Sequence, residues 1–230
     1  MSAGRPADPS RRPGTGRRTG NSPSRRRSAS HQAVTRRHGP QIEAALEAAA
    51  ALLRTAEVDS IAAAVAMCAG ALGRGKQVIF CGNGGSAAQA SHLAGELSGR
   101  FYAERPAIKA LALTDNSAAI TAIANDYGFD RVFERQLEAY GSPGDVLVAL
   151  TTSGRSPNMR RAVVAAAGAG LKTIGLTGRR GRAFGRQCDL AFVVPSDDPA
   201  RIQEVHLLIG HVICAQVEAE LFPAAPGARV

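Results

Sequence analysis

Five short apolar segments alternate with helical patterns along the chain, and this alternation limits its fold more than any other feature. Each segment is apolar throughout, which is typical of parallel strands buried on both faces. Parallel strands need crossover connections, which helices provide. We therefore expect an α/β fold, a three-layer sandwich with a five-stranded parallel sheet flanked by helices. Its strands are expected at 77–82, 108–113, 145–152, 172–178 and 190–195.

Periodic segments between these strands predict the helices. Two Ala- and Leu-rich helices are expected between Gln41 and Gly75, the second beginning after Asp59 or Ser60 as N-cap. Further helices are expected at 85–99, 117–125, 129–140, 157–169 and from about Pro199 to Leu221. In such folds, ligands bind beyond the carboxyl ends of the strands, so functional residues should follow the strands directly.

The positive charge of the chain is concentrated at its N-terminus. Residues 1–38 contain ten Arg and one acidic residue, Asp8, and so account for the whole net charge of +9. This Arg/Pro/Ser-rich segment has few large apolar residues, so we expect a disordered tail over 1–38 and one domain over 39–230. Nucleic-acid contact is then open only to the tail. A spurious or dispensable upstream extension is the alternative, and we favour it.

The remaining bulk features fit a cytoplasmic protein. The four cysteines have no metal or redox spacing, so we expect reduced thiols. No N-terminal apolar region of the signal-peptide kind is present. No run of about eighteen apolar residues suggests a membrane span, and no membrane partner is expected.

Two loops at expected strand ends have residues suited to hold a phosphate. The segment "GNGGS" (82–86) follows the first strand and opens a helix, whose free N–H groups favour an anion. The segment "TTSGRSPN" (151–158) follows the third strand and clusters hydroxyl groups around one glycine. Neither loop has the P-loop or dinucleotide-binding spacing. Each alone is also consistent with an ordinary turn that carries an N-cap Ser.

Two helices carry side chains that suit acid–base or metal chemistry. His92 and Glu96 stand four residues apart and share a helix face, an arrangement that is by itself typical of an exposed surface pair. Gln203 and His211 lie eight residues apart, about 12 Å along one helix, too far for comfortable ligation of one metal. Either these side chains reach inward from both ends, or copies of the helix from different subunits contribute, and we favour the second arrangement.

Three segments together carry a resemblance to a known family: "GNGGSAAQASHLAGELSGRF", "LTDNSAAITAIANDYGFDRVFERQLEAYGSPGDVLVALTTSGRSPN" and "PARIQEVHLLIGHVICAQVE". They resemble the sugar isomerase (SIS) domain family, and within it the phosphoheptose isomerase branch. The resemblance spans roughly Gln41 to Leu221. It implies a five-stranded parallel sheet flanked by helices, a homotetramer, and active sites built at subunit interfaces.

The resemblance also implies a metal site and a substrate site. One zinc ion per subunit is expected on His92, Glu96, Gln203 and His211, all acceptable zinc donors. His206 is then a packing or surface residue. Asn125 and Asp126 also fit a helix-ending turn on local grounds. The substrate is expected to contact Asn83, Gly84, Gly85, Ser86, Glu96, Asn125, Asp126, Thr151, Thr152, Ser153, Ser156 and Gln203.

The implied reaction is aldose–ketose isomerisation of sedoheptulose 7-phosphate to D-glycero-D-manno-heptose 7-phosphate, for the synthesis of activated heptose used in cell-surface or secondary-metabolite glycans. It proceeds through an enediol, with Glu96 as the base and His211 as the acid. Zinc would polarise the carbonyl. Arg155 and Gln89 depart from residues frequent in relatives, but no expected catalytic residue is lost.

Two non-enzymatic interpretations compete with this one. Some proteins with the same core bind a replication initiator, and the Arg-rich tail would suit work near DNA. Those proteins are expected to lack an equivalent of His211, whereas this chain keeps His92, Glu96, Gln203 and His211 together. A sugar-phosphate-sensing domain of a regulator is the other alternative, although no recognisable DNA-binding helical domain accompanies the core.

Overall fold

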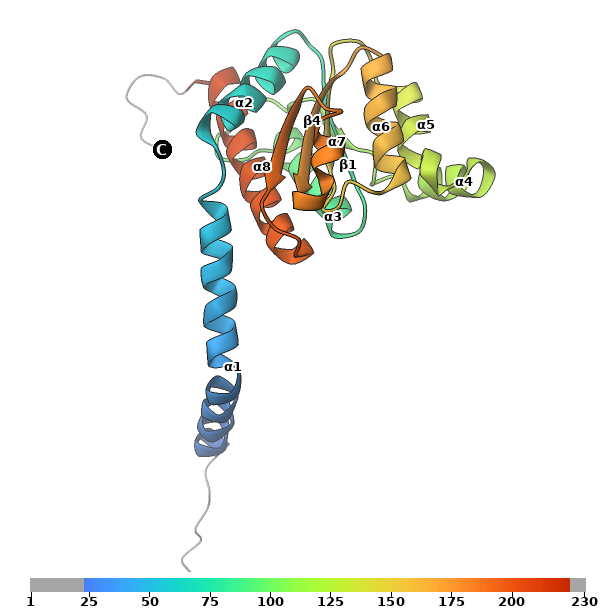
Figure 1. Cartoon of the computed structure of the whole chain (residues 1–230). Coiled ribbons are helices and arrows are strands. Elements are labelled where there is room, and N and C mark those ends of the chain that lie inside the picture. The colour runs from blue at the N-terminus through green and yellow to red at the C-terminus, as the bar shows by residue number, and fades with distance from the viewer. Residues whose placement is uncertain (1–22, 224–230) are drawn as a thin grey trace, which may run out of the picture. The chain divides into compact units, whose positions relative to one another are not determined.

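The computed structural model of the protein describes residues 23–223 and contains a parallel α/β sandwich (Figure 1). Its strands are β1 Val78–Gly82, β2 Ala110–Ala112, β3 Val146–Leu150, β4 Lys172–Gly178 and β5 Leu190–Val194. They form one five-stranded sheet in the order β2-β1-β3-β4-β5, and every pairing is parallel. Gly82 pairs with Leu150, so the loops after β1 and β3 begin side by side. The predicted fold class is therefore confirmed.

The helices follow the predicted order, with differences at their ends. α2 begins earlier than predicted, with Glu57 as its N-cap, and α4 extends to Tyr127. The segment 129–140 opens with a 3-10 turn, and short helical turns over 179–185 were not expected. The elements are α2 Val58–Gly73, α3 Gly85–Ser98, α4 Ser117–Tyr127, η1 Phe129–Arg131, α5 Val132–Tyr140, α6 Pro157–Gly168, η2 Arg179–Gly181, α7 Arg182–Gly185 and α8 Pro199–Leu221.

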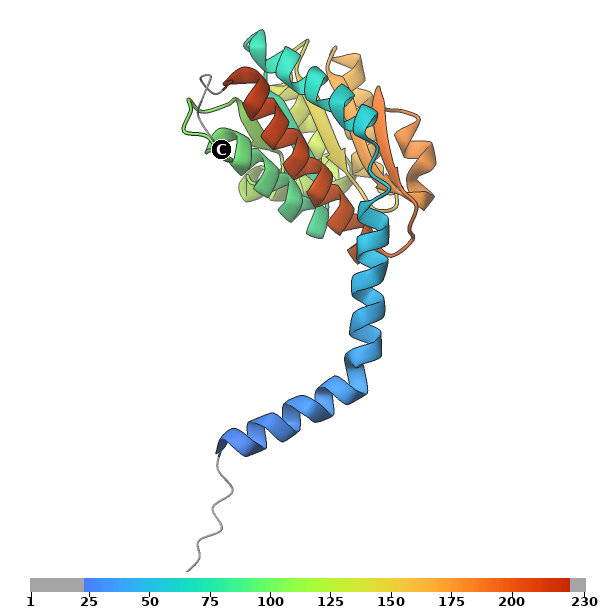
Figure 2. The same ribbon diagram turned by 90° about the vertical axis from the view of Figure 1, so that its left-hand side faces the viewer.

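Helices cover both faces of the sheet, and this explains why the strands are apolar throughout. Val78 and Phe80 of β1 belong to a core formed with α2, α3 and α8. Ile79 and Cys81 point the other way, into a second core formed with α5, α6 and α7. Figure 2 shows α8 lying between α2 and α3 over the first of these faces. Successive strand residues therefore both meet apolar neighbours.

Only part of the segment expected as a disordered tail lies among the described residues. Residues 1–22 and 224–230 lie outside the described residues, whereas 23–38 form part of α1, Pro23–Leu53. Between Ser24 and His38 the chain has neither Gly nor Pro, and its Arg, Ala and Gln residues have good helix propensity. The predicted boundary at residue 38 falls inside this helix. Contacts instead separate a unit that ends at Ala45 from one that begins at Leu46.

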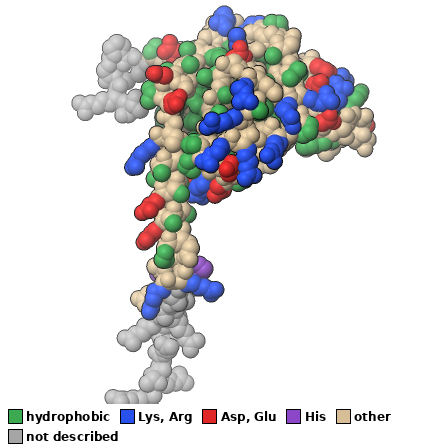
Figure 3. All heavy atoms as spheres, in the orientation of Figure 1, with side chains coloured by type: hydrophobic (Ala, Val, Ile, Leu, Met, Phe, Trp, Pro, Cys, Tyr) green, Lys and Arg blue, Asp and Glu red, His purple; other side chains and the backbone are tan. Residues whose placement is uncertain are grey.

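Within residues 23–223, no single helix is both long and apolar enough to cross a membrane. The segments Val34–Leu53 and Val58–Gly73 meet that length and composition only when taken together, as a bent pair. Charge on the folded unit is mixed. Figure 3 shows Lys and Arg side chains with carboxylates among them, as expected from the equal numbers of basic and acidic residues after residue 38.

Two carboxylates secure the amino-terminal ends of the strands. Asp145 is buried and accepts hydrogen bonds from the main-chain N–H groups of Gln77 and Ser142, at 3.1 and 2.9 Å. Asp189 accepts from the N–H and hydroxyl of Thr173, both at 2.8 Å. Carboxylates can accept several such bonds, so each fixes a loop without a metal or a disulfide. These contacts lie at the end of the sheet opposite the loops that follow the strands.

His206 is a buried histidine on α8 with no hydrogen-bond partner among the residues described. Its exposed fraction is 0%, and both ring nitrogens are unpaired. Burial lowers the pKa of His206 to about 4, while the nearby Thr177 backbone acts in the opposite direction. Of the two roles expected for His206, packing and surface, the structure shows packing.

The His206 environment predicts a loss of stability in mild acid. An unfolded histidine has a pKa of about 6.5, so between that pH and 4 the unfolded chain binds a proton that the folded chain does not. Between pH 7 and pH 5 this difference should remove about 2 kcal/mol of unfolding free energy. Urea titrations at the two pH values measure it. His206→Gln should show a smaller loss, whereas exposed His38→Gln should behave as wild type; equal losses in all three would contradict the prediction.

Candidate active site

The two loops predicted to hold a phosphate are joined by a pair of amides. Asn83 follows β1, and Asn158 lies in the first turn of α6. Each side chain donates to the other, with both N–O distances at 2.9 Å. Asn158 is 1% exposed and Asn83 is partly exposed, so the buried member of the pair has its partner in the other loop. The loop after β1 and the loop after β3 therefore act as one surface at the carboxyl edge of the sheet.

The hydroxyl groups of these loops differ in their surroundings. Thr151 is buried, and its Oγ1 accepts a hydrogen bond from the Gly154 N–H at 3.2 Å, so this hydroxyl braces the loop. Ser153 Oγ accepts from the Arg155 N–H at 3.3 Å. Thr152 and Ser153 are partly exposed, and so is Ser156, the N-cap of α6, whose hydroxyl does not cap the helix. Ser86 lies in the first turn of α3 and is 3% exposed.

His92, Glu96 and His211 come together within one chain. The Nε2 atoms of His92 and His211 are 2.8 Å apart, and His92 Nε2 lies 3.3 Å from Glu96 Oε1. One potential ligand atom from each residue lies within 4.8 Å of the others. Two imidazole nitrogens and a carboxylate oxygen form a donor set suited to a divalent transition metal. The trio therefore fits a metal site, and a second subunit is not needed to bring His211 to it.

The surroundings of His211 favour its neutral imidazole. Burial lowers the pKa of His211 below its ordinary value, nearby His92 lowers it further, and Glu96 acts in the opposite direction. A metal ligand must be deprotonated, so a lowered pKa leaves His211 ready to bind a cation at neutral pH. The ring of Phe101 also packs near His211, with centroids 5.7 Å apart.

A close approach of α3 and α8 brings these residues into contact. Gly210 precedes His211, and a Cβ atom there would lie 2.5 Å from Leu93 Cδ1, which no real contact allows. Leu93 follows His92 and is 1% exposed. Glycine at 210 therefore lets the two helices pack closely enough for the two imidazoles to meet.

Gln203 lies apart from the trio, at the other end of the same helix pair. Its side-chain amide sits over Gly85, where a Cβ atom would come within 2.6 Å of Nε2. Gln89 Nε2 donates to the main-chain carbonyl of Gln203 at 2.6 Å. Three members of the predicted four-residue metal set thus lie together, and the Gln203 side chain lies over Gly85, in the glycine loop expected to contact substrate.

Among the described residues, Asn125 and Asp126 make no hydrogen bond to the loops after β1 and β3. Both are exposed in the last turn of α4, and Asn125 Nδ2 donates to Asp126 Oδ1 at 2.8 Å. A hollow of about 130 Å³ beside the first loop is lined instead by residues such as Asn83, Gly84 and Phe129. Helix α4 continues beyond the predicted end at residue 125 to Tyr127, with Gly128 as its C-cap, so these two residues lie in the helix-ending turn that the local pattern suggested.

Two residues of the site were missed by the sequence reasoning. Asn158 stood within the quoted loop as an ordinary helix-start residue, and only the adjacency of β1 and β3 gives it Asn83 as a partner. Phe101 stood at the end of the helix segment without a role, and α8 gives it His211 as a neighbour. Both roles depend on pairings between distant segments, so no local signal could have identified them.

Comparisons with known proteins find similar sequences and similar folds. The family model described as "SIS domain" matches residues 41–178. A phosphoheptose isomerase of Solidesulfovibrio magneticus is 53% identical over 180 residues, which cover 77% of this chain and 88% of that protein. Solved structures of phosphoheptose isomerases from Neisseria gonorrhoeae and Francisella tularensis superpose with TM-scores of 0.68 and 0.70, at 36% and 37% identity. They cover 85% and 82% of this chain, and 99% and 97% of those chains.

The amide pair predicts that Asn158→Ala destabilises the protein. Removing one partner leaves the Asn83 amide without its hydrogen bonds, which should lower the free energy of unfolding by about 1–3 kcal/mol. Urea unfolding at pH 7 measures the change. Asn125→Ala removes an exposed asparagine and should shift the same quantity by less than about 0.5 kcal/mol. Equal, small changes in the two variants would show that the pair does not hold the loops together.

Proposed function

The chain belongs to the SIS domain family and, within it, to the phosphoheptose isomerases, and on that premise we infer that it is an aldose–ketose isomerase. It converts sedoheptulose 7-phosphate to D-glycero-D-manno-heptose 7-phosphate, a precursor of activated heptose. The observation that carries the chemistry is the meeting of a carboxylate, Glu96, with two imidazoles, His92 and His211. The neighbouring amide-linked loops supply a surface for the phosphate.

We propose that Glu96 and His211 move the protons. The Glu96 carboxylate takes a proton from C1 of the open-chain ketose, and the electrons form a C1–C2 double bond while O2 takes a proton from His211. Glu96 then returns a proton to C2, and O1 gives its proton to His211, which leaves the aldehyde. A carboxylate and an imidazole side by side can perform both halves without a net gain or loss of protons. His211 begins the cycle protonated and is neutral after it has given its proton to O2; its lowered pKa makes the protonated ring a stronger acid for that first transfer.

The loops are proposed to bind the other end of the substrate. Ser86, at the start of α3, and the partly exposed hydroxyls of Thr152, Ser153 and Ser156 are the groups that would hold the phosphate. Thr151 would act through the loop, because its Oγ1 already accepts from Gly154. Asn83, Gly84, Gly85 and Gln203 adjoin this surface, which supports a role in holding the sugar. Anchoring the phosphate would fix the reacting carbons relative to Glu96. For Asn125 and Asp126, substrate contact stays a prediction.

The metal is proposed to be zinc, held by His92, Glu96 and His211. Imidazole nitrogen and carboxylate oxygen are common zinc donors, and the three lie close enough to share one ion. Bound zinc would supply a positive charge that polarises the substrate carbonyl. Gln203 remains a proposed fourth ligand that would have to leave its position over Gly85. Glu96 would then serve both as a ligand of the ion and as the base that takes the substrate proton.

We also propose a cytoplasmic homotetramer with active sites at subunit interfaces. An apolar groove of about 710 Å³ supports self-association; it runs between α2 and α8 and is lined by residues such as Val58, Ile61, Val65 and Val212. Exposed apolar surfaces of this kind commonly mark protein contacts. Nucleic-acid contact through the N-terminal segment stays a prediction. Binding of a replication initiator or sensing of sugar phosphates would not require the assembled trio.

The proposed function predicts turnover of sedoheptulose 7-phosphate by the purified protein with added zinc. Glu96→Gln and His211→Ala should each lower kcat by about 10²- to 10⁴-fold, the usual contribution of a positioned acid or base. Glu138→Gln removes an exposed carboxylate of α5, away from the trio, the loops and the α2–α8 groove, and should leave kcat unchanged. Aldose formation followed by NMR is the measurement. Absence of product with wild type would end the isomerase proposal, and normal rates in Glu96→Gln and His211→Ala would end the residue assignment.

The trio predicts tight zinc binding that depends on both histidines. His92→Ala and His211→Ala should each weaken zinc binding by more than about tenfold, since even outer partners of a ligand have effects of that size. Competition with a chromophoric chelator measures the affinity. His38→Ala, on α1, serves as the matched histidine control and should bind as wild type. Unchanged affinity in the first two variants would place the metal elsewhere.

A further inference from the structure

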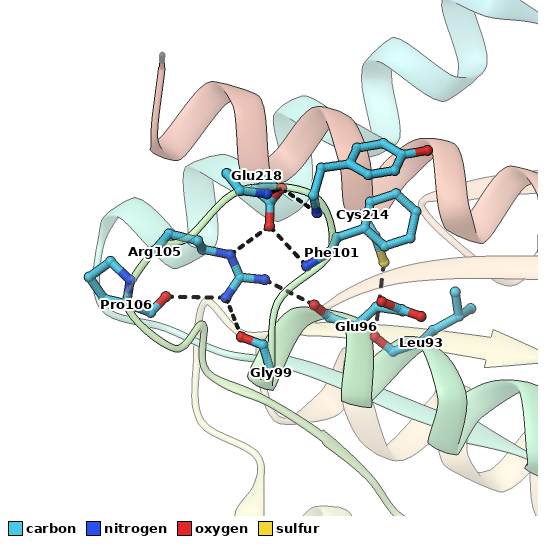
Figure 4. Close-up of polar contacts among 10 residues, drawn as sticks. Leu93, Glu96, Gly99, Phe101, Arg105, Pro106, Cys214 and Glu218 are labelled. Atoms are coloured by element: carbon cyan, nitrogen blue, oxygen red, sulfur yellow. Dashed lines mark hydrogen bonds and ion pairs between the residues drawn. The ribbon is translucent and has the colours of Figure 1, made fainter. Parts of the chain in front are cut away.

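Arg105 and Glu218 form a buried ion pair where the end of α3 meets α8 (Figure 4). Arg105 Nε lies 2.8 Å from Glu218 Oε2, and the two side chains are only 1% and 4% exposed. Such residues are almost never buried this far unless they are paired. Exchange of a buried pair for apolar residues is often neutral or stabilising, so stability alone does not account for its presence.

The Glu218 carboxylate holds the loop that follows α3. It accepts hydrogen bonds from the main-chain N–H groups of Phe101, Tyr102 and Ala103, at 3.0, 2.8 and 2.7 Å. With Arg105 this makes four donors, about the capacity of a carboxylate. Burial by itself raises the pKa of Glu218, but these N–H groups and the guanidinium outweigh it, so the pKa lies below its usual value. The loop is therefore fixed to an ionised side chain of α8.

Arg105 holds the last turn of α3, where Glu96 lies. Its Nη2 donates to the Glu96 carbonyl at 2.9 Å, and its Nη1 donates to the carbonyls of Gly99 and Pro106 at 3.0 and 3.1 Å. The last carbonyls of a helix have no partner within it, so this guanidinium caps α3. Only the planar fork of Arg can reach these carbonyls and the carboxylate together. The main chain of Glu96 is thereby tied to α8.

The same pair determines what surrounds His211. Glu218 binds the Phe101 N–H, and the Phe101 ring lies 5.7 Å from the His211 ring at a tilt of 40°. His211 and Glu218 are seven residues apart, two turns along α8, so they share one face of that helix. Arg105 thus contacts the main chain of Glu96, the proposed base. Glu218 holds Phe101, which packs against His211, the proposed acid.

We propose that Arg105 and Glu218 are positioning residues of the isomerase site, which hold the Glu96 main chain and the Phe101 ring so that Glu96 and His211 meet the substrate in a fixed arrangement. Neither residue contacts the reacting atoms. The kinetic part of this proposal rests on the proposed function, whereas the structural part, control of the His211 surroundings, does not.

The test compares Arg105→Lys and Glu218→Gln with wild type. It measures kcat and KM, and it records the NMR resonances of the histidine rings. Each variant should lower kcat about 10- to 100-fold, the usual effect of losing an outer partner of a functional group, and change KM by less than about threefold. In metal-free ¹H–¹³C spectra, the His211 Hε1 resonance, assigned with His211→Ala, should shift in both variants because the Phe101 ring moves relative to it. Circular dichroism and urea titration verify the fold.

Asp145→Asn is the matched control, because Asp145 is also a buried carboxylate that accepts main-chain N–H groups, at the opposite end of the sheet. It should lose stability but keep both the wild-type kcat and the His211 resonance. Equal loss of kcat in Asp145→Asn at matched stability would show that the pair has only a structural role. Unchanged kcat and resonance in the folded variants would overturn the proposal, and so would failure of both variants to fold.

The two readouts separate this inference from the proposed function. If wild type makes no aldose, the isomerase proposal fails and the kinetic part of the inference fails with it. The resonance of His211 still decides the structural part, since it needs neither substrate nor metal. A shift in both pair variants, without one in Asp145→Asn, would then support the positional role on its own.

Discussion

The close packing of α3 against α8 is the contact on which the candidate site depends. Leu93 occupies the space that a side chain at position 210 would fill, and this brings His92 beside His211. At the other end, Gly85 leaves room for the Gln203 amide. A helix pair held further apart would keep the same fold but separate the imidazoles. Small residues at the crossing thus help to bring the residues of the candidate site together.

The order of the strands provides the second constraint. The strand order is β2-β1-β3-β4-β5. From β1 the chain adds β2 on one side and then β3, β4 and β5 on the other, so the order of the strands switches between β1 and β3. Open α/β sheets bind ligands at such a switch point. The glycine loop follows β1 and the hydroxyl loop follows β3, so both lie at the crevice. The Asn83–Asn158 pair then joins them. Topology brings the loops together, and two amides keep them there.

Buried polar groups in this protein mostly hold loops. Asp145 and Glu218 each accept several main-chain N–H groups, one at the amino ends of the strands and one beside the site. Such bonds replace those that a loop would otherwise make with water, so they determine its conformation more than they add stability. His206 is the contrast: its burial lowers the pKa of the ring to about 4 and therefore makes the folded state sensitive to acid.

The sequence by itself determined the sheet, the order of the helices, the two loops and the His92–Glu96 pair, because each depends on local period or spacing. All five strands and the helix from Pro199 to Leu221 lie where the pattern predicted them, apart from a few end residues. Spacing along α8 could not show that His211 meets His92 while the Gln203 side chain lies over Gly85, since that depends on where another helix crosses it. The tertiary structure alone decided this, together with Asn158 and the Arg105–Glu218 pair, because each of these contacts joins segments far apart in the chain.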